Sequence, residues 1–374
     1  MMVAMKHLSV LIKPASSLCN LRCQYCFYAD ISDLRKVRSF GIMQPEVMEK
    51  MVDHIYDDLE DGDHMTFAFQ GGEPTLAGLS YFDEFVTYVK TKNPAVYVHY
   101  AFQTNGILID KEWCEFFKEH QFLVGLSIDG GIQFHDHHRL DAKGAGTYER
   151  AIAVKRLFDA YEVEYNILCV LTNQNARHPQ KIFRFILKNN IRHIQFVPCL
   201  DGLEVKDSSP YVLQPEQFAH FYKQLYPLWK KEFERGNYIS IGLFDHILNL
   251  LAKGIVGSCG MLGQCQIQYV IEANGNVYPC DFYVLDEFCL GNITDKRLMD
   301  IRQTSTAEKF LVDDMKAVSD YCRSCPFFKI CRGGCKRMKH TMYLNEAETY
   351  CGYQDFLKSH HRSLQAMAQK IRSY

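Results

Sequence analysis

The chain has 374 residues, with 42 Lys and Arg against 44 Asp and Glu, so its formal net charge is −2. This near-neutral balance excludes proteins that bind nucleic acid or a membrane surface through bulk positive charge. The length allows one large domain plus a smaller one, and the composition is ordinary for a globular protein except for its 15 cysteines.

Short apolar segments alternate with amphipathic segments over the first two-thirds of the chain. The predicted strands cover residues 7–12, 65–69, 96–102, 123–128, 164–171 and 193–197, and the predicted helices between them cover 45–58, 80–91, 111–120, 147–160 and 179–189. Several strands are continuous apolar runs, which is typical of parallel strands covered on both faces. Six such units predict a parallel sheet or an incomplete barrel, with ligands at the carboxyl ends of the strands.

The alternation ends after about residue 198. A long helix is predicted over residues 214–236, and from Cys259 onward the sequence is irregular and rich in Cys and Gly. Such a segment favours a second domain organised by bound metal rather than by a large apolar core. We therefore expect one domain at 1–235, including the long helix, and a second at 236–374.

Fifteen cysteines are many for this length, although they are proportionally fewer than in a disulfide-stapled secreted scaffold. The N-terminal segment lacks the apolar core of a secretory signal, and no run of 18 apolar residues is present. We therefore expect a cytoplasmic protein whose thiols stay reduced and serve metal or redox chemistry.

Three cysteines, Cys19, Cys23 and Cys26, follow the first predicted strand within one short loop. Three thiolates on one loop can hold a four-iron cube and leave one iron open for a substrate or cofactor. A zinc loop with a fourth ligand from elsewhere is the alternative on spacing alone. The pattern, with Tyr25 before the last cysteine, resembles the signature of radical S-adenosylmethionine (radical SAM) enzymes. Gly71-Gly72-Glu73-Pro74 after the second strand resembles the motif that holds the methionine amino group in that superfamily, whereas alone it would indicate only a turn.

The later cysteines resemble the signature of the domain called SPASM, with Cys259 as an added upstream ligand. The resemblance implies two closed auxiliary 4Fe-4S clusters, one held by Cys259, Cys265, Cys280 and Cys335 and the other by Cys322, Cys325, Cys331 and Cys351. It also implies a partial (β/α)6 TIM-like radical SAM barrel with a C-terminal cysteine-rich SPASM domain. A treble-clef-like zinc domain is the alternative. Four cysteines remain: Cys114 and Cys169 as core residues, Cys199 after the sixth strand, and Cys289 with no evident role.

A closer resemblance, to anaerobic sulfatase-maturating enzymes, runs through most of the chain. It is carried by LIKPASS (11–17), CFY (26–28), FAFQGGEPTLAG (67–78), QTNG (103–106), VGLSIDG (124–130), NILCV (166–170) and NVYPCDFY (276–283). The resemblance implies oxidation of a cysteine or serine of a sulfatase to Cα-formylglycine. S-adenosylmethionine cleavage would give a 5′-deoxyadenosyl radical, which removes a hydrogen atom from the Cβ of the target residue. The product radical must then lose a proton and an electron.

The resemblance also assigns individual roles. Asp281, next to Cys280, resembles the general base of the family, with a capping or salt-bridged carboxylate as the alternative. The expected contacts to S-adenosylmethionine are Tyr25, Gly72, Ser127, Arg139 and Leu200, and the expected substrate contacts are Tyr28 and Gln70. A plain surface arginine is the alternative for Arg139. We interpret His135, His137 and His138 as part of a solvated loop rather than a metal site.

The expected partners follow from the same resemblance: an unfolded or nascent sulfatase polypeptide, and an electron donor of the flavodoxin or ferredoxin type. We expect a monomer that binds neither nucleic acid nor a membrane. Another SPASM enzyme that modifies peptides, such as one that forms thioethers in a ribosomal peptide, is the first alternative. A non-catalytic iron–sulfur carrier or zinc-organised binding protein is the second, but the open three-cysteine loop argues against it.

Overall fold

The computed structural model describes residues 6–204, 208–315 and 318–372. Its contacts divide the chain into two compact units that alternate along the sequence. The first unit comprises the chain up to Ser127, Arg139–Tyr165 and Gln266–Phe310, and the second comprises Ile128–His138, Asn166–Cys265 and the chain from Leu311. This division differs from the domains at 1–235 and 236–374, which remain a prediction.

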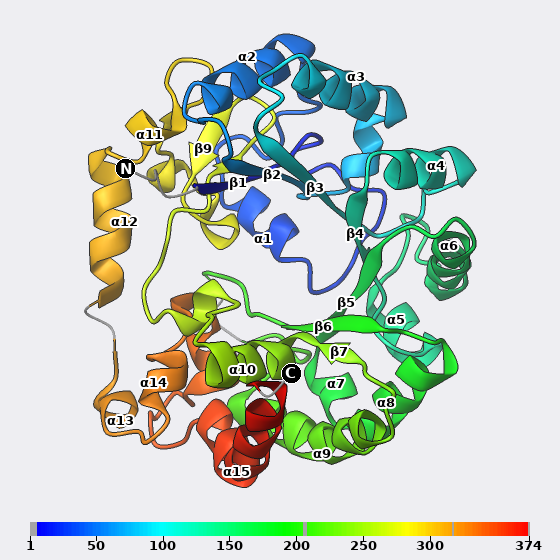
Figure 1. Ribbon diagram of the computed structural model, residues 1–374, viewed down its shortest axis with the longest axis vertical. Helices are drawn as coiled ribbons and strands as arrows, with labels where there is room; N and C mark the ends of the chain where they lie inside the picture. Colours follow the sequence, from blue (N-terminus) through cyan, green and yellow to red (C-terminus); the bar gives the residue numbers. More distant parts are fainter. Residues whose placement is uncertain (1–5, 205–207, 316–317, 373–374) are drawn as a thin grey trace. The chain divides into compact units, whose positions relative to one another are not determined.

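The first unit is built on a sheet in the order β10-β9-β8-β1-β2-β3-β4 (Figure 1). Its parallel strands are β1 (His7–Ile12), β2 (His64–Phe69), β3 (Tyr97–Thr104), β4 (Phe122–Ser127) and the short β8 (Val270–Ile271). Two further strands, β9 (Asn276–Tyr278) and β10 (Gly291–Asn292), run antiparallel to their neighbours. Because β8 pairs with β1, a segment from the C-terminal third of the chain extends the edge of the N-terminal sheet.

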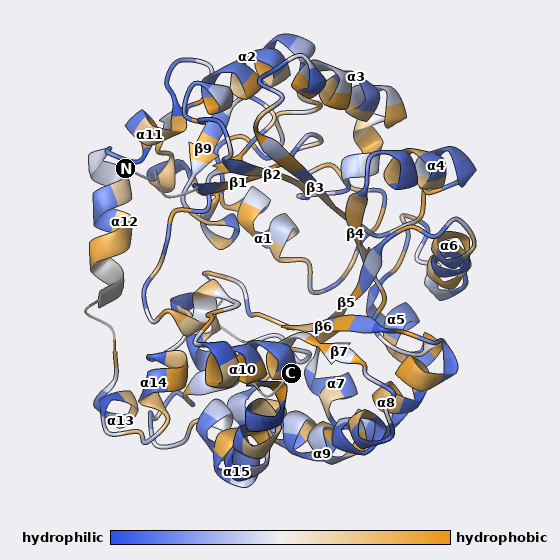
Figure 2. Cartoon of the chain, viewed as in Figure 1, coloured by the Kyte–Doolittle hydropathy of each residue, from blue (hydrophilic) through white to orange (hydrophobic). Residues whose placement is uncertain are grey.

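Amphipathic helices connect these strands, and Figure 2 shows hydrophilic and hydrophobic residues together on α2 and α3. The helices are α1 (Phe27–Asp33), α2 (Pro45–Tyr56), α3 (Leu79–Lys90), α4 (Lys111–Glu119), α6 (Tyr148–Ala160), α11 (Leu298–Ile301) and α12 (Ser305–Met315), which runs on into the second unit. Helix α4 begins where Asp110 accepts a hydrogen bond from the Trp113 amide. Phe69 and Phe102, on adjacent strands, are buried against Phe82 of α3, so aromatic packing fixes the sheet that carries the site.

The second unit contains three parallel strands, β5 (Tyr165–Leu171), β6 (His193–Pro198) and β7 (Ser240–Ile241). Its helices are α5 (Ile132–His138), α7 (Asn173–Ala176), α8 (Pro179–Lys188), α9 (Pro215–Glu234), α10 (Gly242–Lys253), α13 (Asp320–Arg323), α14 (Phe328–Cys331) and α15 (Gly352–Arg372). Tyr226 of α9, Phe244 of α10 and Phe356 of α15 pack against one another as buried rings. These three helices therefore form one apolar cluster around long aromatic side chains.

Short turns of tighter or wider helix complete both units. They are Pro74–Ala77, Cys259–Met261, Asp281–Tyr283, Asp286–Phe288, Lys336–Met338 and the π-helical turn Lys339–Tyr343. Two of the 3-10 turns start at the predicted site residues Cys259 and Asp281. Within the described ranges, no helix combines the length and the apolar character needed to cross a membrane.

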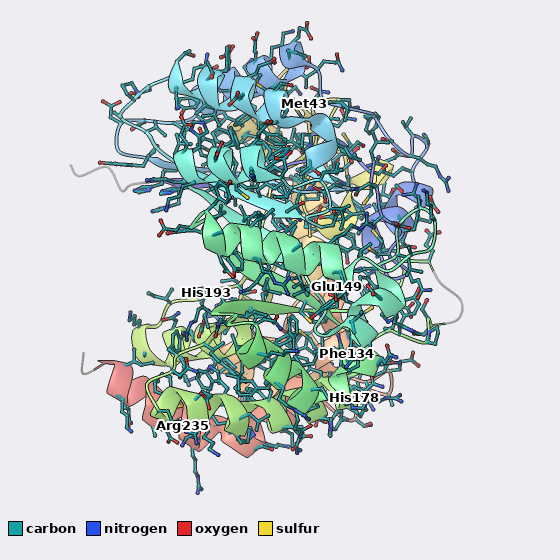
Figure 3. The ribbon with its side chains drawn as sticks, turned by 90° about the vertical axis from the view of Figure 1, so that its right-hand side faces the viewer. Met43, Phe134, Glu149, His178, His193 and Arg235 are labelled. Carbon is teal, nitrogen blue, oxygen red and sulfur yellow. The ribbon has the colours of Figure 1, made fainter. Side chains whose placement is uncertain are left out.

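The predicted strands and helices agree with the observed ones within two residues at either end. The solvated loop expected around His135 and His138 is wrong, because both side chains are buried in α5. His135 Nδ1 accepts a hydrogen bond from the Asp129 amide at 3.3 Å, and the neighbouring Phe134 packs against the ring of His178 (Figure 3). Polar identity therefore did not indicate exposure here, since the imidazole finds its partner inside the fold.

Candidate active site

The three cysteines of the first group lie on the loop between β1 and α1, at the carboxyl end of β1. All three are half-buried, and Cys26 stands at the N-cap of α1. The Cys26 amide donates to the Cys23 carbonyl at 3.2 Å, and the Leu21 amide donates to the Cys19 sulfur at 3.4 Å. The three thiols are still partly accessible, and one of them accepts a hydrogen bond from a backbone amide. Such a loop can supply the cysteine ligands of an iron–sulfur cluster.

The glycine motif after β2 packs directly on the chain that leads into this loop. The Gly72 amide donates to the Ser16 carbonyl at 2.9 Å, and the Glu73 amide donates to the Leu18 carbonyl at 2.7 Å. A Cβ on Gly72 would lie 2.0 Å from the Leu18 oxygen, so no larger residue fits without moving the backbone. The two motifs that the sequence suggested separately are therefore one structural unit.

Glu73 of the same motif has a structural task. Its carboxylate accepts four hydrogen bonds, from the Thr75 amide and hydroxyl, the Thr104 hydroxyl and the Asn105 amide, at 2.7–3.2 Å. Burial raises the pKa of this carboxyl above its ordinary value, and the hydrogen bonds oppose that rise. Glu73 thereby joins the end of β2 to the end of β3 and holds the glycine loop in place.

Asp281, the predicted base, meets the two predicted substrate contacts in one hydrogen-bonded group. Its Oδ2 accepts from the Tyr28 hydroxyl at 2.6 Å and from Gln70 Nε2 at 2.7 Å. Gln70 Nε2 also donates to the Tyr28 oxygen at 2.7 Å. The three side chains come from α1, the end of β2 and the turn after β9, so the hydrogen bonds link segments far apart in sequence.

The second oxygen of Asp281 is different. Oδ1 is buried, in a residue that is only 7% exposed, and it has no hydrogen-bond partner among the residues that the structure describes. Burial raises the pKa of the Asp281 carboxyl, while the Lys13 charge and the bonds from Tyr28 and Gln70 act against the rise. Burial also raises the pKa of Tyr28 well above its ordinary value, so the phenol keeps its proton and donates it. This arrangement leaves one carboxylate oxygen ready to accept a hydrogen bond or a proton from a bound molecule.

A buried ion-pair network of Lys13, Arg35 and Glu272 lies beside Asp281 and Tyr28. The sequence gives only one sign of this network, which is that Lys13 directly follows the apolar strand β1. Glu272 Oε1 lies 3.1 Å from Lys13 Nζ and 2.5 Å from an Arg35 amino nitrogen. Burial raises the pKa of Glu272, but the two cations outweigh that effect and hold its pKa below the ordinary value. Lys13 Nζ also lies 4.9 Å from the centre of the Tyr28 ring, so this group adjoins the hydrogen-bonded base.

Four of the five expected cofactor contacts, Tyr25, Gly72, Ser127 and Arg139, lie in the first unit with the cluster loop. The Arg139 guanidinium lies over the Tyr25 ring at 5.6 Å and is 7% exposed, so it is not a surface arginine. Ser127, at the end of β4, accepts a hydrogen bond from Gln103 Nε2 at 3.0 Å. Leu200 is buried in the second unit after β6. The arrangement therefore joins Tyr25 to Arg139, and leaves the roles of Ser127 and Leu200 as predictions.

Four cysteines of the second unit surround one cavity. Cys322, Cys325, Cys331 and Cys351 line it together with aromatic side chains and Gln354. Gln354 donates through Nε2 to the Cys325 sulfur at 3.1 Å and through its amide to the Cys351 sulfur at 3.4 Å. Hydrogen bonds to thiolate sulfurs and an apolar wall are what a buried iron–sulfur cluster needs, so this set fits the predicted auxiliary cluster.

The remaining predicted ligands are divided between the units. Cys259, Cys265 and Cys335 belong to the second unit, whereas Cys280 belongs to the first and directly precedes Asp281. Within the part of the chain that the structure describes, no three Cys, His, Asp or Glu side chains are grouped closely enough to hold a single metal ion.

Comparisons with known proteins agree with this geometry. A model of the radical SAM superfamily matches residues 14–186, and the model of SPASM, an iron-sulfur cluster-binding domain, matches residues 253–326. A cysteine-type anaerobic sulfatase-maturating enzyme of Clostridium perfringens is 44% identical and covers 95% of this chain and 96% of its own length. A serine-type anaerobic sulfatase-maturating enzyme of Bacteroides thetaiotaomicron is 28% identical and covers 98% and 95%.

A solved structure described as native anSMEcpe with bound AdoMet and Cp18Cys peptide superposes on 98% of this chain and 99% of its own. Its TM-score is 0.89 at 39% identity. Together with the two matching domain models, these likenesses identify the fold as a partial radical SAM barrel with a SPASM domain, which hold 4Fe-4S clusters and S-adenosylmethionine. The chain belongs to the anaerobic sulfatase-maturating enzymes.

Proposed function

We propose that this enzyme oxidises one cysteine or serine of a sulfatase polypeptide to Cα-formylglycine, with Asp281 as the base that takes the proton. The observation that supports the proposal most directly is the buried, unpartnered Oδ1 of Asp281, whose other oxygen is held by Tyr28 and Gln70. Membership of a family whose relatives are named as cysteine-type or serine-type anaerobic sulfatase-maturating enzymes supports the oxidation of such a residue.

The reaction removes three particles from the target residue: a hydrogen atom from Cβ, a proton from the SH or OH, and an electron. When bound, S-adenosylmethionine and the clusters supply the radical that takes the hydrogen atom and the redox centres that accept the electron. The task of the protein is to bind the proton at Asp281 Oδ1, which forms a new O–H bond as the S–H or O–H bond breaks. A serine then gives the aldehyde directly, and a cysteine gives a thioaldehyde that water converts to the aldehyde and hydrogen sulfide.

Tyr28 and Gln70 act on this step by positioning the base. Both donate to Oδ2, so the carboxylate plane is fixed and Oδ1 is left for the substrate. Two donors on one oxygen also stabilise the negative charge until the proton arrives. Contacts of Tyr28 and Gln70 with the substrate peptide remain part of the proposal, and the resemblance to the family supports them.

The ligand sets complete the proposal. Cys19, Cys23 and Cys26 hold the open cluster, beside which Tyr25, Gly72, Ser127, Arg139 and Leu200 bind S-adenosylmethionine. Cys322, Cys325, Cys331 and Cys351 hold one auxiliary cluster, and the cavity that they share supports this. The set of Cys259, Cys265, Cys280 and Cys335 for the other auxiliary cluster rests on the resemblance. We also propose a flavodoxin- or ferredoxin-type electron donor and action in the cytoplasm, on a sulfatase polypeptide that has not yet folded.

The target residue is proposed to be cysteine. The cysteine-type relative from Clostridium perfringens is 44% identical to this chain, whereas the serine-type relative from Bacteroides thetaiotaomicron is 28% identical. The bound peptide of the similar solved structure is also named as a cysteine peptide. Paired peptides that differ only in Cys or Ser at the target position, analysed by mass spectrometry after turnover, test this preference.

The base is tested with Asp281→Asn, which keeps the shape of the side chain but accepts a proton poorly. We expect formation of 5′-deoxyadenosine to stay within a few-fold of wild type while the aldehyde peptide falls by about 100-fold or more. Asp295→Asn, at an exposed carboxylate of the same unit, is the matched control and keeps both products. Normal aldehyde formation by Asp281→Asn would overturn the assignment, and a thioether product from the wild type would favour the alternative peptide-modifying activity.

A further inference from the structure

Charge is unevenly distributed along the segment that carries most of the late cysteines. Residues 321–345 contain six Lys or Arg and no Asp or Glu, in a chain whose net charge is only −2. Cys322, Cys325, Cys331 and Cys335 lie within these 25 residues. A cationic segment around proposed cluster ligands therefore stands out from the near-neutral background.

Two of the six cations, Arg337 and Lys339, each bind an oxygen of another segment of the chain. Arg337 donates to the Asp201 carbonyl, and Lys339 Nζ pairs with Glu348 at 2.5 Å. The other four are Arg323, Lys329, Arg332 and Lys336, and we call them the basic face. The first three are exposed and Lys336 is half-buried, so the basic face presents its charge mainly to solvent. Arg323 Nε donates to the Val318 carbonyl at 3.2 Å and lies 3.9 Å from Asp320. The Arg323 side chain is 60% exposed and Asp320 is fully exposed, so water screens this ion pair and the guanidinium charge can still act on a partner.

A depression leads from the basic face toward the proposed cluster. It is lined by Arg332, Lys336 and Lys339 and reaches Cys322, and its described lining contains no acidic residue. Cys322 also lines the adjoining cavity that the four cysteines share. Two residues of the basic face, Arg332 and Lys336, therefore line a depression that leads from the surface to Cys322, a buried proposed cluster ligand.

The cations could instead serve only to offset the negative charge of the cluster and its thiolates. Exposed charges act weakly on a buried group, because water and salt screen them over about 8–10 Å. Arg323 and Lys329 are exposed on α13 and α14 and are poorly placed for that task. Surface charge has a stronger effect on the rate at which a charged partner associates with the protein. Electron-transfer complexes have small interfaces, so electrostatic steering is important for their formation.

We propose that the basic face docks an acidic one-electron carrier, a flavin or iron–sulfur protein in its oxidised form, against Cys322. The inference rests on the proposed function, because that reaction releases one electron per target residue after the proton has gone to Asp281. The carrier takes up this electron and becomes reduced by one electron, and no bond to it forms or breaks. Its acidic side chains pair with the basic face, which gives the carrier a direction of approach.

The test uses the holoenzyme with all clusters and oxidised flavodoxin as the probe. Isothermal titration measures the affinity at about 50 mM and about 300 mM NaCl, since an electrostatic complex weakens with salt. The test variant is Arg323→Glu with Arg332→Glu, and the control is Arg184→Glu with Lys188→Glu on exposed positions of α8 in the same unit. Both doubles change the net charge equally, so a difference between them reports position and not total charge.

We expect the basic-face double to weaken binding by about tenfold or more at low salt and to abolish its salt dependence, while the control stays within about twofold. Redox titration should give unchanged cluster potentials in both doubles. Unchanged binding in the basic-face double, or equal loss in the control, overturns the proposal, as does a shifted potential with unchanged binding. Binding is measured without substrate, so failure of peptide oxidation, assayed separately with dithionite, would be distinguishable from failure of docking.

Discussion

Replacing Gly72 with alanine tests whether the glycine motif and the cysteine loop act as one unit. The added Cβ would lie 2.0 Å from the Leu18 oxygen and 2.7 Å from the Ser17 carbonyl carbon, all of them backbone atoms. Relief requires the two segments to separate by about 1 Å or more, which strains the hydrogen bonds of the Gly72 and Glu73 amides to the cysteine loop. Overpacking and two weakened buried hydrogen bonds cost about 2–5 kcal/mol together.

The displacement also moves the cysteine loop relative to the motif proposed to hold the methionine group. A misplacement of about 1 Å costs roughly 100-fold in rate when geometry controls the reaction. Anaerobic thermal unfolding and chromatographic measurement of 5′-deoxyadenosine follow the two effects. Gly242→Ala is the control, because its Cβ would meet nothing closer than 3.6 Å. A Gly72→Ala enzyme with wild-type unfolding temperature and wild-type cofactor cleavage would refute this reasoning.

Three further predictions concern single contacts. Tyr28→Phe removes one of the donors to Asp281 and should lower the aldehyde formed per 5′-deoxyadenosine by about tenfold; an unchanged ratio in product analysis would contradict this. Glu272→Gln leaves two buried cations without a counter-charge and should cost about 3–5 kcal/mol in denaturant unfolding, whereas a loss below about 1 kcal/mol would match a surface ion pair. Gln354→Leu removes a hydrogen bond to the Cys325 sulfur and should make that cluster harder to reduce, which potentiometric titration followed by electron paramagnetic resonance can check.

Much of the fold could be predicted from the sequence, because its elements are set by local patterns. The apolar run of β1 and the amphipathic α8 are examples, and both fall within a residue of their predicted bounds. The loop of Cys19, Cys23 and Cys26 is local as well, since its spacing alone places three thiols together. Elements whose signal depends on the rest of the fold were less predictable, as the buried helix α5 shows.

The candidate site was predictable residue by residue but not as an arrangement. Gln70 and Asp281 are 211 residues apart, and only the pairing of distant strands brings them within hydrogen-bond distance. Glu272 was not predictable for the same reason, because a glutamate that follows a two-residue apolar strand carries no local sign of its burial between Lys13 and Arg35. Burial and ion pairing are properties of tertiary packing, so a charge alone does not reveal them.

The pairing of β8 with β1 has a consequence for protein engineering. The hairpin that ends at Asp281 continues the N-terminal sheet, and its anchor Glu272 is bonded to two cations from the first 35 residues. A chimera that exchanged the cysteine-rich region of one relative for that of another at a boundary near residue 236 would therefore exchange an edge strand as well. Shuffled enzymes should keep their activity only when β1, α1 and the hairpin are inherited from the same parent.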